Sequence, residues 1–328
     1  QPLQSASASA SSTDVVSGGG GGLGLITARW LAERSREKHV LLMSRSGALS
    51  IAATRARREG GGNVRTGRGD VGEAAERGEL AAGVWCGLPA LGGVWHAAGV
   101  LADGLLPGQT SKSLRVSYGP KAFGAINVHH SCAAVPLRAS VSFSSIAALL
   151  GGSAQANYAA ANTTLDVLAL SCHAIGRVGC SVQWGPWAGS GMAATNAISS
   201  RMANLGFGMI DPWQGIVAMD SAISSPDVAV QALMPVRWEA LLRFGIPPLL
   251  QSFARFAAST PKAKRVARQP QQAAVPAAVK AVQPVVTLPQ MLTMLRETAG
   301  ADVDADTPLM DAGLDSLGAV ELRNQLQA

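Results

Sequence analysis

The side chains with the clearest chemistry lie in the middle of the chain, where Ser145 precedes Tyr158 and Asn162. The alternation of Val141 and Phe143 predicts a strand that ends near Ser145, and the alanine-rich run that follows predicts a helix. Tyr158 and Asn162 are four residues apart, so they face the same way on that helix. A serine at the end of a strand can hold a carbonyl oxygen while a tyrosine on the next helix donates a proton. The pattern therefore favours the reduction of a carbonyl group.

A tyrosine acid needs a neighbouring cation, because the pKa of a free phenol is about 10 and such a group is slow at neutral pH. Lys121 stands in a helical pattern just before the predicted strand and is the candidate for that cation. The alternative is that the serine, tyrosine and asparagine only pack and cap an alanine-rich helix. The rest of the chain decides between these two interpretations.

A glycine run near the start of the chain has the context of a dinucleotide-binding loop. Residues Asp14–Ser17 predict a short strand, Gly18–Gly24 contain the pattern G-x-G-x-x-G, and a helical pattern and the strand His39–Met43 follow. Glycines let the backbone approach a pyrophosphate, and the helix N-terminus offers unpaired N–H groups. The sequence therefore predicts cofactor-binding residues in this loop: Gly19, Gly21, Gly22, Leu23 and Gly24.

The end of the second predicted strand indicates which cofactor is bound. A site that selects NAD places Asp or Glu roughly 20 residues after the glycines, where the carboxylate binds the ribose hydroxyls. Here Arg45 takes that place between Ser44 and Ser46, and no acid is present. A guanidinium suits a 2′-phosphate, so the sequence favours NADPH. The alternative is a surface arginine in a turn.

Further strands complete the predicted parallel sheet. One lies near Val64 and is expected to be interrupted by Gly67 and Gly69, because glycine weakens a strand. Another is expected within Leu91–Val100, which predicts a buried strand that runs into a turn of small residues, and His96 in it is interpreted as a packed residue. Two more are Cys180–Trp184 and Val228–Leu233. A helix is expected near residues 52–58, and a lid is expected over residues 189–207, with Met192 at its start. The ends of these strands supply the remaining predicted cofactor contacts: Asp70, Val71, Ala97, Ala98, Gly99, Gly185 and Pro186.

Composition excludes several classes of protein. The net charge is +6 over 328 residues, but the excess lies in local clusters with no interleaved aromatic residues, so no nucleic-acid partner is expected. No apolar run reaches about 18 residues, so no membrane association is expected. The 4 cysteines lack metal-ligand spacing, which favours free thiols in a reducing, cytoplasmic location and no bound metal. The first residue is Gln1, and the chain is expected to be a piece of a longer polypeptide.

Taken together, these motifs resemble those of the ketoreductase domain of modular type I polyketide synthases, a short-chain dehydrogenase/reductase. The resemblance rests on the glycine run, His96–Val100, Ser145 with Tyr158 and Asn162, and Trp184–Trp187. It implies an α/β fold of the Rossmann type with a parallel sheet. It also implies a catalytic tetrad in which Lys121 comes from the family pattern Pro-Lys-x-x-Gly and Asn162 takes the place where ordinary members of the fold keep lysine.

The resemblance extends to substrate and stereochemistry. It implies NADPH-dependent reduction of a β-ketoacyl thioester, with an acyl chain on a carrier protein and neighbouring synthase domains as partners. One stereochemical group of the family carries Leu-Asp-Asp after the His-Ala-Ala-Gly turn. Here Asp103 keeps the diagnostic final acid, Asn157 also resembles this group, and Leu150 stands where the other group has tryptophan. The implied product has a D-configured hydroxyl, while the alternative role for Asp103 is a helix cap.

The C-terminal segment resembles the start of an acyl carrier protein. Asp311–Leu317 matches the attachment motif for 4′-phosphopantetheine, and Ser316 would carry that group. The expected organisation is a linker over 1–13, the reductase over 14–250, an interdomain linker over 251–285, and a partial all-α carrier domain over 286–328. Two alternatives remain, which are the reductase–carrier segment of an animal-type fatty acid synthase and a non-catalytic scaffolding ketoreductase.

Overall fold

The structure is a computed structural model that describes residues 11–34, 38–47, 63–73, 87–189, 196–225, 227–243 and 246–257, together with residues 292, 293 and 296. The chain divides into two compact units. The first comprises Gln1–Ser199 and Met209–Pro235, and the second comprises Ser200–Gly208 and Val236–Ala328.

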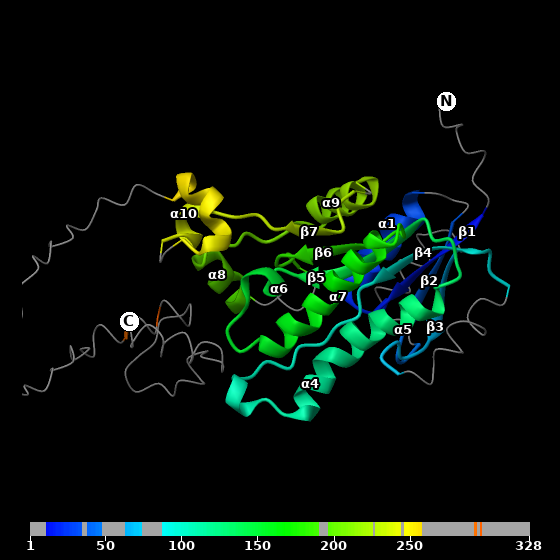
Figure 1. The fold of residues 1–328 in the computed structure, drawn as a ribbon, viewed down its shortest axis with the longest axis horizontal. Helices are drawn as coiled ribbons and strands as arrows, with labels where there is room; N and C mark the ends of the chain where they lie inside the picture. Colours follow the sequence, from blue (N-terminus) through cyan, green and yellow to red (C-terminus); the bar gives the residue numbers. More distant parts are fainter. Residues whose placement is uncertain are drawn as a thin grey trace, which may run out of the picture. The chain divides into compact units, whose positions relative to one another are not determined.

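The first unit is built on a 7-stranded sheet whose neighbouring strands all pair in parallel (Figure 1). The strand order is β3-β2-β1-β4-β5-β6-β7, so the direction of winding reverses between β1 and β4. Ligands of such sheets bind beyond the carboxyl ends of the strands at this reversal. The strands are β1 (Ser12–Ser17), β2 (Lys38–Ser44), β3 (Val64–Arg68), β4 (Leu91–His96), β5 (Ala139–Ser145), β6 (Cys180–Trp184) and β7 (Val230–Leu233).

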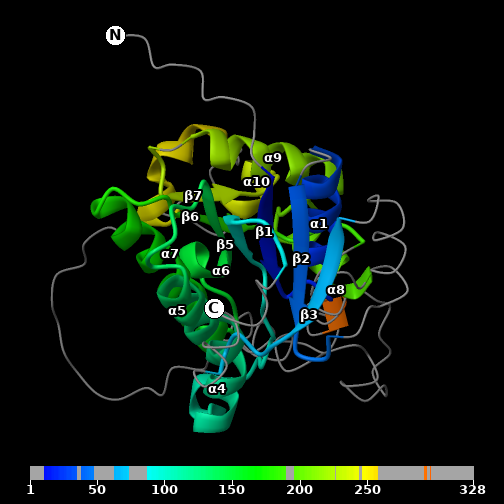
Figure 2. The same cartoon turned by 90° about the vertical axis from the view of Figure 1, so that its right-hand side faces the viewer.

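Helices cover both faces of the sheet (Figure 2). On one face, α1 and α9 pack on an apolar layer that includes Val16, Leu42 and Val182. On the other face lie α5 and α7, with Val128 of α5 packed on the cluster that contains Val15 and Met43. The helical segments of this unit are α1 (Gly22–Arg34), η2 (Leu106–Gly108), α4 (Ser111–Tyr118), the π-helix η3 (Gly119–Phe123), α5 (Gly124–Ser131), α6 (Ala147–Leu150), α7 (Ala156–Ala174) and α9 (Pro212–Ser224).

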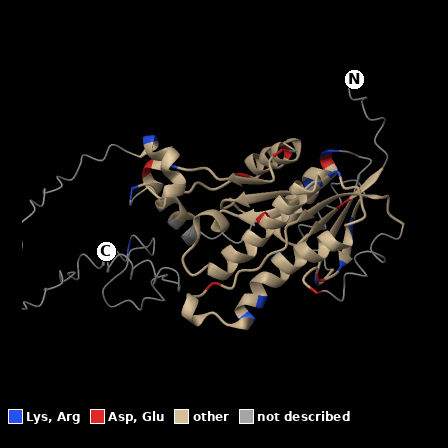
Figure 3. Cartoon of the chain, in the orientation of Figure 1, with Lys and Arg blue, Asp and Glu red and all other residues tan. Residues whose placement is uncertain are grey.

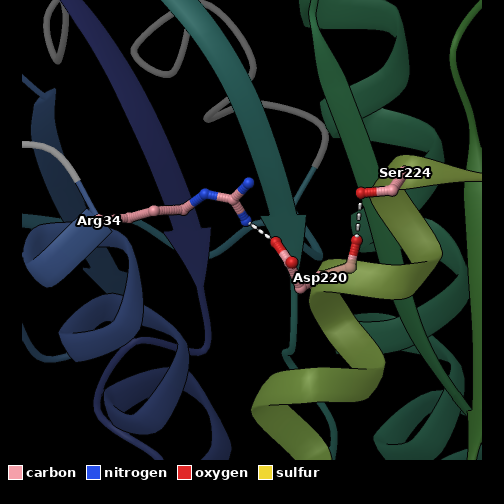
Figure 4. A network of polar contacts seen from close by, with 3 residues as sticks. All are labelled: Arg34, Asp220 and Ser224. Atoms are coloured by element: carbon pink, nitrogen blue, oxygen red, sulfur yellow. Dashed lines mark hydrogen bonds and ion pairs between the residues drawn. The ribbon is translucent and has the colours of Figure 1, made fainter.

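Local sequence explains where α9 begins and how closely it packs. Asp211 accepts a hydrogen bond from the Trp213 backbone N–H at 2.9 Å, while the side chain of Gln214 accepts one from the Asp211 backbone N–H. A Cβ at Gly215 would lie 1.9 Å from the Trp187 ring, so only glycine fits there. Arg34, the last residue of α1, forms an ion pair with Asp220 of α9 (Figure 4).

Charged residues of the described chain lie mostly at helix ends and in loops (Figure 3). The exceptions include Lys121 and Asp166, which are buried in the first unit. A buried charge is costly unless it is paired or hydrogen-bonded, so both residues need a functional or structural explanation. They belong to the site described below.

The second unit holds a small aromatic cluster. Phe207 pairs with Val236 in an antiparallel bridge, and the Arg237 backbone N–H donates to the Gly206 carbonyl at 2.8 Å. Trp238 stacks on Phe253 with 4.1 Å between ring centroids. The helical segments α10 (Trp238–Leu241) and η4 (Pro248–Phe256) carry these rings, and α8 (Asn196–Asn204) ends in this unit.

The predicted fold class is confirmed, with differences at the boundaries. β1 begins at Ser12 rather than Asp14 because Ser12 pairs with Lys38 of β2. Gly67 lies inside β3 and does not interrupt it. The expected lid over residues 189–207 contains the helix α8, and residues 190–195 of it lie outside the described residues.

Other expectations concern parts of the chain that lie outside the described residues. They include the helix near 52–58, most of the linker over 251–285, and Ser316 with almost all of the carrier segment. The described start of that linker is not irregular throughout, since η4 reaches Phe256. Within the described residues, no helix is long and apolar enough to cross a membrane. No cluster of His, Cys, Asp or Glu there has the arrangement of a metal site, and Cys132, Cys172 and Cys180 are free and buried.

Candidate active site

Three elements bring the predicted catalytic residues together. Ser145 is the last residue of β5, Tyr158 and Asn162 lie on the first turns of α7, and Lys121 lies in the π-helix between α4 and α5. Pro120 lacks a backbone N–H and lies at the start of that π-turn, where a regular helical ladder is not continued. α7 is anchored to β5 because the Ser144 hydroxyl donates to the Asn162 carbonyl at 3.3 Å.

Lys121 is a buried cation beside the tyrosine. Its Nζ donates to the Phe143 carbonyl at 2.7 Å and lies 5.3 Å from the centroid of the Tyr158 ring. Burial lowers the pKa of Lys121 from 10.5 to about 7, and the carboxylate of Asp166 acts in the opposite direction. A buried lysine with a strongly perturbed pKa beside a tyrosine is typical of a functional site.

Tyr158 is held as a neutral phenol in the folded chain. Burial raises its pKa above the ordinary value, and the polar side chains of Asn162 and Ser145 act to lower it. The Asn162 amide donates to the Tyr158 carbonyl at 2.8 Å, one helical turn apart. The Ser145 hydroxyl accepts a hydrogen bond from the Ala147 backbone N–H at 3.2 Å, which leaves its own proton available for another acceptor. The arrangement thus offers two O–H donors to a substrate oxygen.

Asp166 is a site residue that the sequence reasoning missed. It lies on α7 eight residues after Tyr158, so its helical position repeats the face of Tyr158 and Asn162. Its two carboxylate oxygens accept hydrogen bonds from the Ser181 hydroxyl at 2.6 Å and the Gln183 amide at 2.8 Å. The spacing of four between Asn162 and Asp166 was the signal that would have found it.

His96 positions the lysine segment and does not touch the reacting groups described here. Its Nε2 lies 2.9 Å from the Lys121 carbonyl oxygen, which only accepts, so Nε2 carries the proton. Its Nδ1 then accepts from the Ser17 hydroxyl at 2.7 Å. Burial lowers the pKa of His96 to about 4, which keeps the ring neutral. The sequence predicted a packed residue, and the structure adds the link from β1 and β4 to the π-helix.

The glycine loop has the shape that a cofactor pyrophosphate needs. A Cβ on Gly18 would lie 2.7 Å from the Ala98 backbone, and one on Gly24 would lie 2.5 Å from the Gly18 carbonyl oxygen. The loop closes through a 2.9 Å hydrogen bond from Gly21 to Gly18, and α1 begins at Gly22 with no acid in its first turn. The backbone itself forms this cradle, so the residues present fit a dinucleotide.

The other predicted cofactor residues lie along the same edge of the sheet. Gly47 donates to the Ser44 carbonyl at 3.2 Å, so Arg45 and Ser46 are the central residues of a turn. After β3, the Asp70 carboxylate accepts from Gly72 at 2.9 Å, and Asn127 donates to the Val71 carbonyl at 2.8 Å. The residues that follow β4 and β6 also lie at this edge: Ala97, Ala98, Gly99, Gly185 and Pro186. A Cβ at position 99 would come within 2.8 Å of the Lys121 side chain, so glycine makes room for the lysine.

The loop that carries Asp103 is hydrogen-bonded to the start of α7, which carries Asn157. Asn157 donates to the Ala102 carbonyl at 2.7 Å, and Gln155 donates to the Asp103 carboxylate at 3.0 Å. A third link joins the backbone of Gly104 to the Ala154 carbonyl at 2.8 Å. The loop after β4 is therefore tied to the start of α7, close in sequence to Tyr158. Gln155 was not among the predicted residues.

A Rossmann sheet with a glycine cradle, and a serine, tyrosine and lysine beside it, defines an oxidoreductase of the short-chain dehydrogenase/reductase class that uses a nicotinamide cofactor. Comparison with known families narrows this class. Residues 12–189 match the KR domain, and residues 289–328 match the phosphopantetheine attachment site. The chain belongs to the KR family of polyketide synthase ketoreductases, followed by a phosphopantetheine attachment segment.

Relatives with curated names are polyketide synthases. The chain is 35% identical over 322 residues to the spectinabilin polyketide synthase system protein NorB of Streptomyces orinoci, covering 93% of this chain and 15% of that protein. It is 33% identical over 320 residues to polyketide synthase GfsB of Streptomyces halstedii, covering 92% of this chain and 6% of that protein. The chain thus spans a small part of the length of these relatives.

Solved structures of ketoreductases share the fold. A structure of A-type ketoreductases from a modular polyketide synthase superposes with a TM-score of 0.69 at 32% identity, covering 76% of this chain and 53% of that chain. The ketoreductase from the first module of phoslactomycin biosynthesis in Streptomyces sp. HK803 gives a TM-score of 0.68 at 32% identity, covering 75% and 58% of the two chains. The chain therefore spans about half the length of these structures.

Proposed function

We propose that this chain reduces the ketone of a β-ketoacyl thioester, held on a phosphopantetheine arm, to the β-hydroxyacyl thioester with NADPH. The observation that carries the proposal is the meeting of the neutral Tyr158 phenol, the Lys121 cation and the Ser145 hydroxyl beside the glycine cradle. When bound, the cofactor supplies the hydride to the carbonyl carbon. The oxygen of the same carbonyl then requires a proton and a stabilised negative charge.

The residues of the chain supply that proton and stabilise that charge. The Ser145 proton is free to bond the carbonyl oxygen because its Oγ already accepts from the Ala147 N–H. Tyr158 donates its phenolic proton to the same oxygen as the alkoxide develops. Lys121, 5.3 Å from the Tyr158 ring, stabilises the phenolate that remains. Asn162 fixes the first turns of α7 through its bond to the Tyr158 carbonyl.

NADPH is proposed over NADH because Arg45 occupies the turn after β2, where a selective NAD site carries an acid. The arginine is exposed at the edge where the adenosine ribose would lie. A charge-assisted bond between guanidinium and phosphate contributes about 1.5–3 kcal/mol before solvent screening. The predicted cofactor contacts and the stereocontrol role of Asp103 and Asn157 remain part of this proposal.

The wider setting is also proposed. Ser316 would carry 4′-phosphopantetheine, neighbouring synthase domains would deliver and accept the acyl chain, and the protein would work in the cytoplasm. The boundaries 14–250, 251–285 and 286–328 belong to the same proposal. The names of the relatives favour a polyketide synthase over an animal-type fatty acid synthase.

The test measures turnover of a 3-ketoacyl pantetheine thioester, monitored as the loss of NADPH absorbance. Tyr158→Phe should remove most turnover and keep NADPH binding, because the ring remains and only the proton donor is lost. The chain has 2 tyrosines, so Tyr118→Phe on α4 is a matched control that should stay active. Ser145→Ala should lower kcat by about 10²-fold. Turnover of Tyr158→Phe at the wild-type rate would refute the mechanism, and no turnover of the wild type would favour the scaffolding alternative.

A further inference from the structure

The turn that carries Arg45 is flanked by a second arginine. β2 and β3 pair in parallel register, so their last residues Ser44 and Arg68 lie side by side. The backbone N–H of Gly69 donates to the Ser44 carbonyl at 3.0 Å, which fixes the end of β3 against the turn. Gly47 closes that turn with φ of +63°, and a Cβ on Gly47 would lie 2.9 Å from the Arg68 Cβ. The stem of Arg68 therefore abuts the turn that holds Arg45.

Strand alternation shows which face Arg68 occupies. Side chains two residues apart in a strand share a face, so Arg68 lies on the face of Val64 and Ser44 on the face of Leu42. Val64 and Leu42 both belong to the apolar layer under α1. The glycine loop approaches this same face, because a Cβ on Gly20 would lie 3.7 Å from the Ser44 Cβ. The cradle, the turn and Arg68 are thus successive neighbours on one face of the sheet.

The charges at this corner have the same sign. Arg45 and Arg68 are both exposed, and within the described part of the chain no hydrogen bond or ion pair engages either guanidinium. A cation in the turn and a second cation beside the turn repel each other, and an anion bound between them would offset that repulsion. A phosphate monoester carries close to two negative charges and accepts several N–H donors at once.

We propose that Arg68 is a second specificity residue for the cofactor 2′-phosphate, which it binds together with Arg45 from the end of β3 beside the Ser44–Gly47 turn. This inference rests on the proposed use of NADPH. It assigns to the end of β3 a role in cofactor choice that the sequence pattern after β2 does not reveal. Binding of the phosphate should depend on salt, because both guanidinium groups are exposed to solvent.

The experiment measures cofactor dissociation constants without substrate, by quenching of tryptophan fluorescence. Arg68→Ala is compared with Arg45→Ala and with the matched control Arg65→Ala, which removes an exposed arginine from the opposite face of the same strand. The probes are NADPH, NADH, adenosine 2′,5′-bisphosphate and 5′-AMP. Arg68→Ala should raise the dissociation constants of NADPH and the bisphosphate about tenfold at low salt, with little change for NADH and 5′-AMP. The loss should shrink in about 0.5 M salt, by screening.

The outcomes separate this inference from the proposed function. If Arg45→Ala weakens NADPH binding and Arg68→Ala does not, the role of Arg68 is overturned and the NADPH proposal stands. If neither variant changes the ratio of NADPH to NADH affinity, both are overturned. Equal losses in Arg65→Ala and Arg68→Ala would show only a general effect of positive charge at the sheet edge, and would also overturn the role of Arg68. Thermal unfolding of each variant confirms that the fold is intact.

Discussion

The burial of Lys121 lowers the stability of the folded state, although the proposed reaction needs this lysine. The variant Lys121→Met should therefore gain stability and lose activity. The pKa of Lys121 falls from 10.5 to about 7 on folding, so at neutral pH the folded state must give up about half of a proton that the unfolded state holds fully. One pKa unit corresponds to about 1.36 kcal/mol, so at pH 7 the shift amounts to a cost of about 4 kcal/mol. The methionine side chain would carry no charge and would leave the Phe143 carbonyl without its donor, which costs about 1–3 kcal/mol.

The expected result is a variant that is inactive yet about 1–3 kcal/mol more stable at pH 7. The direction in which stability changes with pH follows from how many protons each state binds. Between pH 7 and 10.5 the unfolded state binds more protons than the folded state, so the Lys121 contribution makes the wild type more stable as pH rises. The advantage of the variant should therefore shrink by about 2 kcal/mol between pH 7 and pH 9.

Urea unfolding of both proteins across this pH range measures the difference directly. Other titrating groups are common to the two proteins, so they cancel in the difference between the unfolding free energies. Lys112→Met, on the exposed side of α4, is the control and should show no such pH dependence. A Lys121→Met protein that is less stable than the wild type at every pH, by a constant amount, would refute the reasoning.

Three further tests probe the same site and the carrier segment. Asp166→Asn should lower the pKa of the catalytic lysine further and move the alkaline limb of the pH–rate profile to lower pH. Asp220→Asn on α9 is the control, and an unmoved limb in a folded Asp166→Asn variant would contradict the coupling. The product should be the D-configured alcohol by chiral chromatography, and Gln155→Ala should lower that selectivity because it removes a donor that holds the Asp103 carboxylate. A tenfold preference needs only about 1.4 kcal/mol; predominantly L-alcohol from the wild type would show that Asp103 does not set the face. In a chain extended through the whole carrier domain, a phosphopantetheinyl transferase should add its group to the wild type and not to Ser316→Ala, as intact mass would show; modification of both proteins would place the group elsewhere.

Much of the sheet was predictable because its signals are local. The strand Cys180–Trp184 is a short apolar run bounded by Gly185 and Pro186, and its bounds were predicted correctly from sequence. A strand within Leu91–Val100 was also predicted, and the structure ends it at His96. The start of β1 was less predictable. Ser12 and Thr13 are polar residues that join the strand because their partners on β2 and the Pro89 carbonyl lie beside them. Pairing with a distant segment, which the local sequence does not reveal, decided that boundary.

Gly67 shows the same limit of prediction from local sequence, because here the sequence argued against a strand that the structure contains. Glycine weakens a strand on its own, yet β3 continues through Gly67 because β2 supplies a parallel partner along its whole length. Likewise, the short α6 and the π-helix around Lys121 depend on the packing of β5 and α7, so neither had a sequence signal strong enough to predict it.

The sequence alone determined the class of chemistry. Residue types and spacing, as in Ser145 with Tyr158 and Asn162 and in the glycine run after β1, are set along the chain and indicate the reaction before any folding is considered. Only the tertiary structure decided how those groups are tuned. The pKa of Lys121 near 7 and the neutral state of His96 arise from burial. The placement of Arg68 beside the turn after β2 arises from pairing between strands that a long stretch of chain separates. Burial and strand pairing are properties of distant segments brought together, and the local sequence does not encode them.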